Sequence, residues 1–267
     1  MEKSVLITGA CGGMGSAAVR KLSSMGYRVF ALDRSVSEEN IDGVIPIAAD
    51  VTDEESVRIA FEKIRGITDS IFAIIHFAGV YMLNSLVEMD SSEFERIFKV
   101  NLGGVFLINK IFMPLLSNGS RIVITTSELA PLDPLPFTGV YAVSKAALDK
   151  YAYSLRMELQ LKGIAVSVLR AGAVDTGMLG VSLDALNRFT EKTELYTCNA
   201  ARFKKIVERV EARCVPADAI ADKVTGIISK KRARFAYSIN RNPLLLMLNA
   251  LPRRMQFFII RRILRDK

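Results

Sequence analysis

The stretch that most constrains the fold is residues 4–33, where a glycine-rich loop joins an apolar strand to an amphipathic helix. The apolar run SVLIT ends at Gly9, the loop GACGGMG begins there, and a helix is predicted over residues 14–25. A second apolar run stops at Asp33. Glycines let a backbone approach a pyrophosphate, and a helix N-terminus offers it free N–H groups. The unit therefore predicts a dinucleotide site, with a tight glycine turn that holds no ligand as the alternative.

The remaining chain repeats strand and helix at intervals of 20 to 40 residues. Further strands are predicted at residues 44–48, 71–75, 121–125, 164–169 and 235–239. Thr52 begins a segment with capping-box spacing, and Ser91 or Ser92 is a candidate cap for a later helix. The alternation is typical of an α/β protein, a Rossmann-type doubly wound parallel sheet of about seven strands, whose ligands bind beyond the carboxyl ends of the strands.

Six predicted strands end at residues suited to such a site, namely Gly9, Asp33, Asp50, Ala78, Ser127 and Gly172. We expect a single catalytic domain over residues 1–242, including a helical substrate lid at about 177–215, and a tail over residues 243–267. No internal repeat or low-complexity linker divides the chain.

Tyr141 and Lys145 lie four residues apart in a run with helical periodicity that closes at Gly163. This spacing places both side chains on one face, a single turn apart. A nearby cation favours the phenolate, and at the upper limit it lowers a Tyr pKa by about three units. Such a pair is also common as a solvated surface contact, so its surroundings decide whether it does chemistry.

These residues together resemble the single-domain branch of the short-chain dehydrogenase/reductase family. Thr8-Gly9-x-x-x-Gly13-x-Gly15 is similar to its cofactor loop, and Tyr141-x-x-x-Lys145 to its active-site pair. Asn101 in VNLGG and Ser127 in TTS match two further motif positions. The resemblance covers about residues 3–176.

The resemblance implies a set of roles. Ser127 would hold the substrate oxygen, Tyr141 would give or take the hydroxyl proton, and Lys145 would lower the Tyr pKa and bind the nicotinamide ribose. Asn101 would hold a water that passes the proton onward. The implied cofactor-binding residues are Gly9, Cys11, Gly12, Gly13, Met14, Gly15, Asp33, Arg34, Asp50, Val51, Ala78, Gly79, Tyr141, Lys145, Gly172, Val174 and Thr176.

Three positions depart from the family pattern. Ser127 lies fourteen residues before Tyr141, one more than usual, and the usual position is Glu128. We attribute the difference to one extra residue in the loop over 129–138. His76, the only histidine, replaces an asparagine and is interpreted as a structural residue at a strand end. Ala171 replaces a proline before Gly172.

Cofactor choice depends on Asp33. A carboxylate there would repel a 2′-phosphate and accept ribose hydroxyls, which favours NAD. Arg34 could instead accept a phosphate, so NADP is possible.

Composition narrows the class of protein. Half of the 267 residues are hydrophobic, as expected for a globular domain. The three cysteines are widely spaced, which predicts neither a disulfide framework nor a metal site and favours a reducing, cytoplasmic location. No secretory signal is expected at the N-terminus.

The net charge of +8 is concentrated near the C-terminus. Eleven basic residues and one acid follow from Lys230, whereas residues 1–229 carry 25 basic and 27 acidic side chains. We therefore expect no nucleic-acid binding by the body. Its tail has apolar helical pieces at 244–251 and 255–264 with arginine flanks, too short to span a bilayer. These pieces could contact a membrane surface, pack on a partner subunit or cover the substrate mouth.

The leading hypothesis is an NAD(P)(H)-dependent oxidoreductase that interconverts a secondary alcohol and a ketone on a hydrophobic small molecule, such as a hydroxysteroid-like, retinoid-like or acyl-chain compound. The apolar residues of the lid could wall such a pocket or simply cover the sheet. By resemblance, the protein would be a homodimer or homotetramer paired through the Asn101 and Tyr141 helices. The alternative is a catalytically silent dinucleotide-binding regulator or scaffold.

Overall fold

A computed structural model describes residues 3–36, 39–175, 178–211 and 214–265. Its centre is a seven-stranded sheet in the spatial order β3-β2-β1-β4-β5-β6-β9, and every neighbouring pair is parallel. The strands are β1 (Ser4–Thr8), β2 (Arg28–Asp33), β3 (Val44–Ala48), β4 (Ala73–His76), β5 (Arg121–Ser127), β6 (Ala165–Ala171) and β9 (Ala236–Ile239). The predicted Rossmann-type α/β fold is therefore confirmed.

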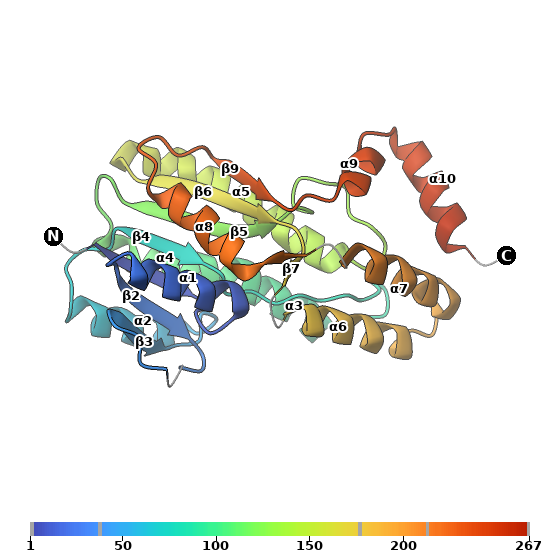
Figure 1. The fold of residues 1–267 in the computed structure, drawn as a ribbon. Helices are drawn as coiled ribbons and strands as arrows, with labels where there is room; N and C mark the ends of the chain where they lie inside the picture. The colour runs from blue at the N-terminus through green and yellow to red at the C-terminus, as the bar shows by residue number, and fades with distance from the viewer. Residues whose placement is uncertain (1–2, 37–38, 176–177, 212–213, 266–267) are drawn as a thin grey trace.

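Helices cover both faces of the sheet (Figure 1). The helices of the main body are α1 (Gly13–Ser24), α2 (Glu54–Arg65), α3 (Ser91–Phe98), α4 (Gly104–Phe112), α5 (Gly139–Leu159) and α8 (Ala217–Ile228). Short 3-10 turns, η2 (Met113–Leu115) and η3 (Gln160–Lys162), extend α4 and α5, and a π-helical turn, η1 (Lys99–Gly103), joins α3 to α4.

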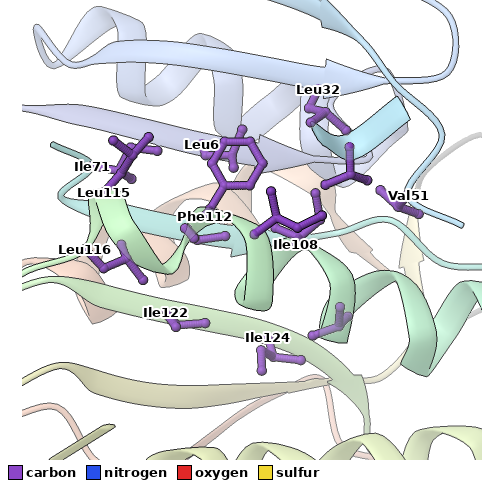
Figure 2. Packing of buried hydrophobic residues seen from close by; sticks show 14 of the residues in the cluster. Leu6, Leu32, Val51, Ile71, Ile108, Phe112, Leu115, Leu116, Ile122 and Ile124 are labelled. Carbon is purple, nitrogen blue, oxygen red and sulfur yellow. The ribbon is translucent and has the colours of Figure 1, made fainter. Parts of the chain in front are cut away.

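The strand sequences explain the two layers, because successive side chains of a strand point to opposite faces. Val5 and Ile7 of β1 pack with α1 and α8, whereas Leu6 between them packs with α2, α4 and α5. Figure 2 shows the hydrophobic cluster that contains Leu6, in which Ile108 and Phe112 of α4 lie against the strands. Both faces of the central strands are thus buried, as the continuous apolar runs predict.

Four more helices gather at one end of the molecule, beyond the carboxyl ends of the strands (Figure 1). They are α6 (Met178–Lys192), α7 (Thr197–Glu211), α9 (Pro243–Asn249) and α10 (Arg253–Leu264). A small parallel pair, β7 (Val174–Asp175) with β8 (Val215–Pro216), joins the segments that lead into α6 and out of α7. The sequence did not indicate this pair, since two-residue strands carry no periodicity.

Several boundaries differ from the sequence expectations. Asp53, not Thr52, caps α2, since its carboxylate accepts the N–H of Glu55 at 3.0 Å. The Thr52 hydroxyl instead donates to Asp50. Asp90 precedes α3 as its N-cap residue and makes no side-chain capping bond, so neither Ser91 nor Ser92 is the cap.

The continuous helical stretch Ser91–Leu115 is long and apolar enough to cross a membrane by length and composition alone. Its residues Val105, Ile108 and Phe112 are buried in the main core, and it lies flat on the sheet as the layer seen in Figure 2. This stretch is therefore accounted for as a core helix of the fold.

Candidate active site

The glycine loop forms a tight cradle between β1 and α1. Gly9 has a φ of 70°, and a Cβ at Gly15 would lie 2.0 Å from the Gly9 carbonyl oxygen. Gly12 is the N-cap of α1 with no side-chain capping bond, and no acidic residue lies in the first turn. The first N–H groups of a helix have no intrahelical partner, and here no carboxylate competes for them. The residues present therefore fit a pyrophosphate.

Asp33, at the end of β2, lies against this loop. One carboxylate oxygen accepts the Cys11 N–H at 3.0 Å, and the other accepts the Arg34 N–H at 2.7 Å. The Cys11 thiol donates to the Ser35 carbonyl at 2.9 Å. These bonds fix the carboxylate beside the loop, while the Arg34 side chain is exposed next to it. The structure thus brings together the loop and both residues expected to choose between NAD and NADP.

Asp50, Val51 and Ala78 complete the same edge of the sheet. One Asp50 oxygen accepts both the N–H and the hydroxyl of Thr52 at 2.8 Å, and the backbone bond is the main reason that the Asp50 pKa is lowered. Val51 is buried. Ala78 donates its N–H to the Thr8 hydroxyl at 3.4 Å, which ties the end of β4 to the end of β1.

Tyr141 and Lys145 lie in the first turns of α5, and Ser127 is the last residue of β5. The hydroxyl of Ser127 forms a hydrogen bond with that of Tyr141. Lys145 is buried, its Nζ donates to the Thr125 carbonyl at 3.2 Å, and it lies 5.8 Å from the centre of the Tyr141 ring. The extra residue before Tyr141 is absorbed by a turn in which Leu129 donates to the Ser127 hydroxyl at 3.2 Å. Ser127, rather than Glu128, therefore faces Tyr141.

Desolvation dominates the electrostatics of this pair. It raises the pKa of Tyr141 to about 12, although the Ser127 hydrogen bond opposes the rise, and it lowers the pKa of Lys145 to about 8. In the protein alone the net pKa of Tyr141 is therefore raised, and the lowering by Lys145 stays a prediction for the site with its cofactor. Burial penalises both charged forms, and the ammonium group points at a backbone carbonyl instead of the phenol oxygen.

Asn101 lies in the π-helical turn η1 and is fully buried. Its Oδ1 accepts the Val80 N–H at 2.8 Å, while its Nδ2 donates to the Val80 carbonyl at 3.1 Å and to the Ser144 hydroxyl at 3.0 Å. Single π-turns often mark functional sites, because they reorient one residue of a helix. Both amide protons are committed, so a proton relay at Asn101 would use an acceptor oxygen. Gly79 lies close to both Asn101 and Lys145. A Cβ at Gly79 would lie 3.2 Å from Asn101 Oδ1 and 3.5 Å from Lys145 Nζ.

His76 is buried at the end of β4, and its Nε2 pairs with Asn109 Oδ1 at 3.0 Å. Burial lowers its pKa to about 4, so the ring is neutral at pH 7. Asn109 in turn donates to the Tyr151 hydroxyl at 3.3 Å. This agrees with the interpretation of His76 as a structural residue. In the described part of the chain, no group of three or more His, Cys, Asp or Glu residues could hold a metal ion.

A cavity of about 550 Å³ opens above Ser127, Tyr141 and Lys145. The main body contributes Val80, Tyr81 and Leu135, and the Tyr81 ring lies edge-on to Tyr141 with centroids 4.8 Å apart. Helix α7 contributes Phe203, Ile206 and Val207. Both tail helices also line the cavity, through Leu244, Leu245, Leu248, Ile259, Ile260, Ile263 and Leu264. The contacts therefore place both tail helices in the wall of this cavity.

The lid residues divide between two roles. Phe189 is buried and packs with Phe137, at 4.6 Å between ring centroids, rather than lining the cavity. Phe137 also contacts Tyr196 and Phe203, and it adopts a φ of 66°, which is unfavourable for an aromatic residue. This aromatic cluster joins α6 and α7 to the loop before α5. Among the described residues, the tail and α7 line the cavity, and Phe189 of α6 packs beside it.

Glu128 is a site residue that motif matching missed. Its carboxylate accepts the Asn242 N–H at 2.6 Å, so it ties the end of β5 to the start of α9, and burial raises its pKa. It lines the cavity beside Ser127. The sequence did offer one indication of this role, because Glu128 stands at the position where the family pattern has its serine.

The remaining predicted cofactor residues differ in where they lie. Met14, Gly79, Gly172 and Val174 line the cavity. Gly172 also has a packing role, because a Cβ there would lie 1.9 Å from the Asn240 carbonyl oxygen. Thr176 lies outside the described residues.

Fold and site together define a dinucleotide-dependent α/β enzyme of the tyrosine–lysine type. Comparison with known proteins agrees, since the family model described as short chain dehydrogenase matches residues 3–186. The chain is 34% identical over 180 residues to NADPH-dependent 1-acyldihydroxyacetone phosphate reductase of Schizosaccharomyces pombe, covering 66% of this chain and 61% of that protein. It is 30% identical over 247 residues to the uncharacterized oxidoreductase YbbO of Escherichia coli K12, covering 90% of this chain and 86% of the relative.

Among solved structures, the ligand-free aldohexose dehydrogenase of Thermoplasma acidophilum superposes with a TM-score of 0.75 at 21% identity, covering 89% of this chain and 92% of that one. At this identity the likeness supports the fold alone. The chain belongs to the short chain dehydrogenase family, a family of NAD(P)-dependent oxidoreductases.

Proposed function

We propose that this protein interconverts a secondary alcohol and a ketone on a hydrophobic small molecule, with NAD as its preferred cofactor. The observation that carries the proposal is the Ser127–Tyr141 hydrogen bond beside buried Lys145, at the floor of an apolar cavity. A regulatory binding protein would need the glycine loop but has no use for this buried polar cluster.

The roles of the residues follow from their positions. The cofactor supplies hydride chemistry at its nicotinamide. Ser127 and Tyr141 present two hydroxyls at one point of the cavity, where they would hold the substrate oxygen. Burial raises the pKa of Tyr141 to about 12, so the hydroxyl is protonated at neutral pH, and its position would let it donate that proton to a forming alkoxide. Lys145 would bind ribose hydroxyls and, when charged, stabilise the phenolate that results.

The cavity supports a hydrophobic substrate class. Its walls are leucine, isoleucine, valine and aromatic side chains, and its polar groups cluster near Ser127 and Tyr141. A volume of about 550 Å³ lies within the range of roughly 300–1,000 Å³ that is usual for small-molecule sites. A steroid-like, retinoid-like or acyl-chain ketone would fit this division between an apolar wall and a polar floor. The yeast relative named an acyldihydroxyacetone phosphate reductase also supports the acyl-chain member of this set.

Asp33 supports NAD over NADP. Its carboxylate is held beside the loop by two backbone N–H groups, so it would meet a 2′-phosphate with like charge. The exposed Arg34 and the NADPH-dependent relative favour NADP instead. Measuring kcat/KM with each cofactor decides between them.

Exposed apolar side chains on α4 and α5 support a homo-oligomer. Phe106, Val143, Tyr153 and Met157 are all exposed on these two helices. We propose that they pair across a two-fold axis, which would bury them against the same residues of a second copy.

Activity should be tested with reduced and oxidised nicotinamide cofactors on long-chain, steroid and retinoid ketones and alcohols. Tyr141→Phe should lower kcat by about 10²–10⁴-fold and leave cofactor affinity nearly unchanged, because only the proton donor is removed. Tyr27→Phe is the matched control, because Tyr27 lies just before β2 at the amino ends of the strands, away from the cavity. Cofactor binding without turnover of any substrate would favour the silent binding protein, and full activity of Tyr141→Phe would refute the mechanism.

A further inference from the structure

The two tail helices carry large apolar side chains on their outer surface. Leu244 and Met247 of α9 and Met255, Phe257, Phe258 and Ile263 of α10 are between 50% and 68% exposed. We call these six residues the apolar tail face. They occupy only twenty residues of chain, so this is a local concentration of exposed apolar groups and not the scatter usual on a soluble surface.

Arginines are interleaved with this face. Helix α10 has the sequence RRMQFFIIRRIL, with four arginines and no acid. Arg254, Phe258 and Arg262 follow one another at intervals of four residues, so they share one stripe of the helix. Gln256 and Leu264 point the other way and are buried.

Only one of these four arginines has an acidic partner in the described structure. Arg253 pairs with Asp133 at 3.2 Å. Arg254, Arg261 and Arg262 are exposed and form no ion pair with the residues that the structure describes. Arginine can lay its stem along an apolar surface while its guanidinium reaches outward, so the mixture suits an apolar layer bounded by negative charge.

The apolar tail face is continuous with the cavity mouth. Leu244 and Ile263 both line the cavity and are at least half exposed, and Ile206 of α7 also lines the cavity and is exposed. These residues therefore mark the rim through which the cavity meets the exterior. The same helices lie together at the end of the molecule opposite the N-terminus (Figure 1).

We propose that the apolar tail face docks on an anionic lipid bilayer and places the cavity mouth against the membrane surface. Charge decides against a second copy of this chain as the occupant. A two-fold contact would bring the same patch against itself and set unpaired arginines of both copies face to face. Anionic headgroups supply the missing negative charge, and the acyl boundary accepts Phe257, Phe258 and Met255.

Vesicle flotation with the full chain tests this proposal without depending on any substrate. We expect the protein to float with vesicles of phosphatidylcholine mixed with phosphatidylglycerol, and to float poorly with phosphatidylcholine alone or at high salt. Replacing Arg254, Arg261 and Arg262 by glutamine should lower the partition coefficient roughly 100-fold, because each basic residue near an anionic surface contributes about a fivefold factor. The control replaces exposed Lys230, Lys231 and Arg232 by glutamine, an equal loss of charge away from the tail face.

A second pair of variants tests the apolar contribution. Phe257→Ser with Phe258→Ser should lower partitioning about tenfold or more, since both rings lose their burial in the lipid boundary. Ile59→Ser with Ile67→Ser removes similarly exposed apolar groups near α2 and should change nothing. All of these residues are exposed, so the variants should keep the wild-type circular dichroism.

Three results would overturn the proposal. The first is no flotation of the wild-type protein with anionic vesicles. The second is equal loss of binding in the tail variants and their matched controls. The third is a change of sedimentation mass without lipid on replacing Phe257 and Phe258, which would assign the face to contact between copies of this chain.

Discussion

Replacing Lys145 with methionine is expected to make the cofactor-free protein more stable at pH 7 while removing its activity. Lys145 is 6% exposed, and desolvation lowers its pKa from 10.5 to about 8. At pH 7 it is charged in both the folded and the unfolded protein, so folding transfers an ammonium group into a buried site. A pKa difference of that size corresponds to about 3 kcal/mol of unfavourable free energy.

The substitution would recover most of this free energy. Methionine has a similar length and no charge to desolvate. It would lose the hydrogen bond from Nζ to the Thr125 carbonyl, which at 3.2 Å contributes about 1 kcal/mol. We therefore expect a net gain of about 2 kcal/mol in the free energy of unfolding, or a rise in Tm of roughly 4–8 °C. The wild-type residue would then be retained for its role in the site and not for stability.

The stability of the protein should also change with pH. A lysine whose folded pKa is lowered releases its proton on folding between about pH 8 and pH 10.5, so the stability of the wild-type protein should rise with pH across that range. Tyr141, whose pKa burial raises to about 12, acts in the opposite direction, and stability should fall again above pH 10. Lys145→Met should lack the rise between pH 8 and pH 10 and keep the fall.

Urea unfolding of the cofactor-free protein, followed by circular dichroism at several pH values, measures the gain in stability of Lys145→Met at pH 7. It also measures the rise in wild-type stability between pH 8 and pH 10 and the fall above pH 10. Lys150→Met is the control, because Lys150 lies on the same helix and is exposed. Lower stability of Lys145→Met than of the wild-type protein at pH 7 would refute the desolvation argument. So would a wild-type stability that is flat between pH 8 and pH 10.

Two further substitutions test the choice of cofactor and a buried ion pair between α5 and β6. Asp33→Ser should raise the ratio of kcat/KM with NADPH to kcat/KM with NADH by about tenfold or more. The substitution removes a carboxylate that would repel a 2′-phosphate beside Arg34. An unchanged ratio would show that Asp33 does not set cofactor choice. Asp149→Asn should lower the free energy of unfolding by about 3 kcal/mol, since the carboxylate holds Arg170 of β6 through two bonds of 3.0 and 2.7 Å in a largely buried site. Glu54→Gln, which breaks exposed pairs with Arg58 and Lys110, should cost much less in the same urea titration, and an equal cost for both would contradict the burial argument.

The sequence by itself determined the sheet and most of its ligand edge. Continuous apolar runs mark strands buried on both faces, and glycine or acidic residues follow them at the carboxyl ends. The positions of Gly9, Asp33 and Ser127 could be assigned because each is the last residue of its strand or the one directly after it. Local chemistry of this kind is visible in a linear sequence.

The sequence misplaced features that depend on competition between neighbouring groups. Thr52 had the right spacing to cap α2, but Asp50 takes its hydroxyl and Asp53 makes the cap instead. The charge on Lys145 suggested a lowered Tyr141 pKa, yet burial raises the pKa of Tyr141 and lowers that of Lys145. Both outcomes depend on distances and burial that residue spacing does not specify.

Only the tertiary structure decided where the tail lies. Residues 243–267 showed apolar helical pieces with arginine flanks, and those pieces were compatible with a membrane, a partner or the substrate mouth. Packing of α9 and α10 over the cavity, with Glu128 holding the Asn242 N–H, resolved that they form the cavity wall. An amphipathic pattern specifies that a helix has an apolar face, whereas the surface that covers this face is set by contacts more than 100 residues apart in the chain.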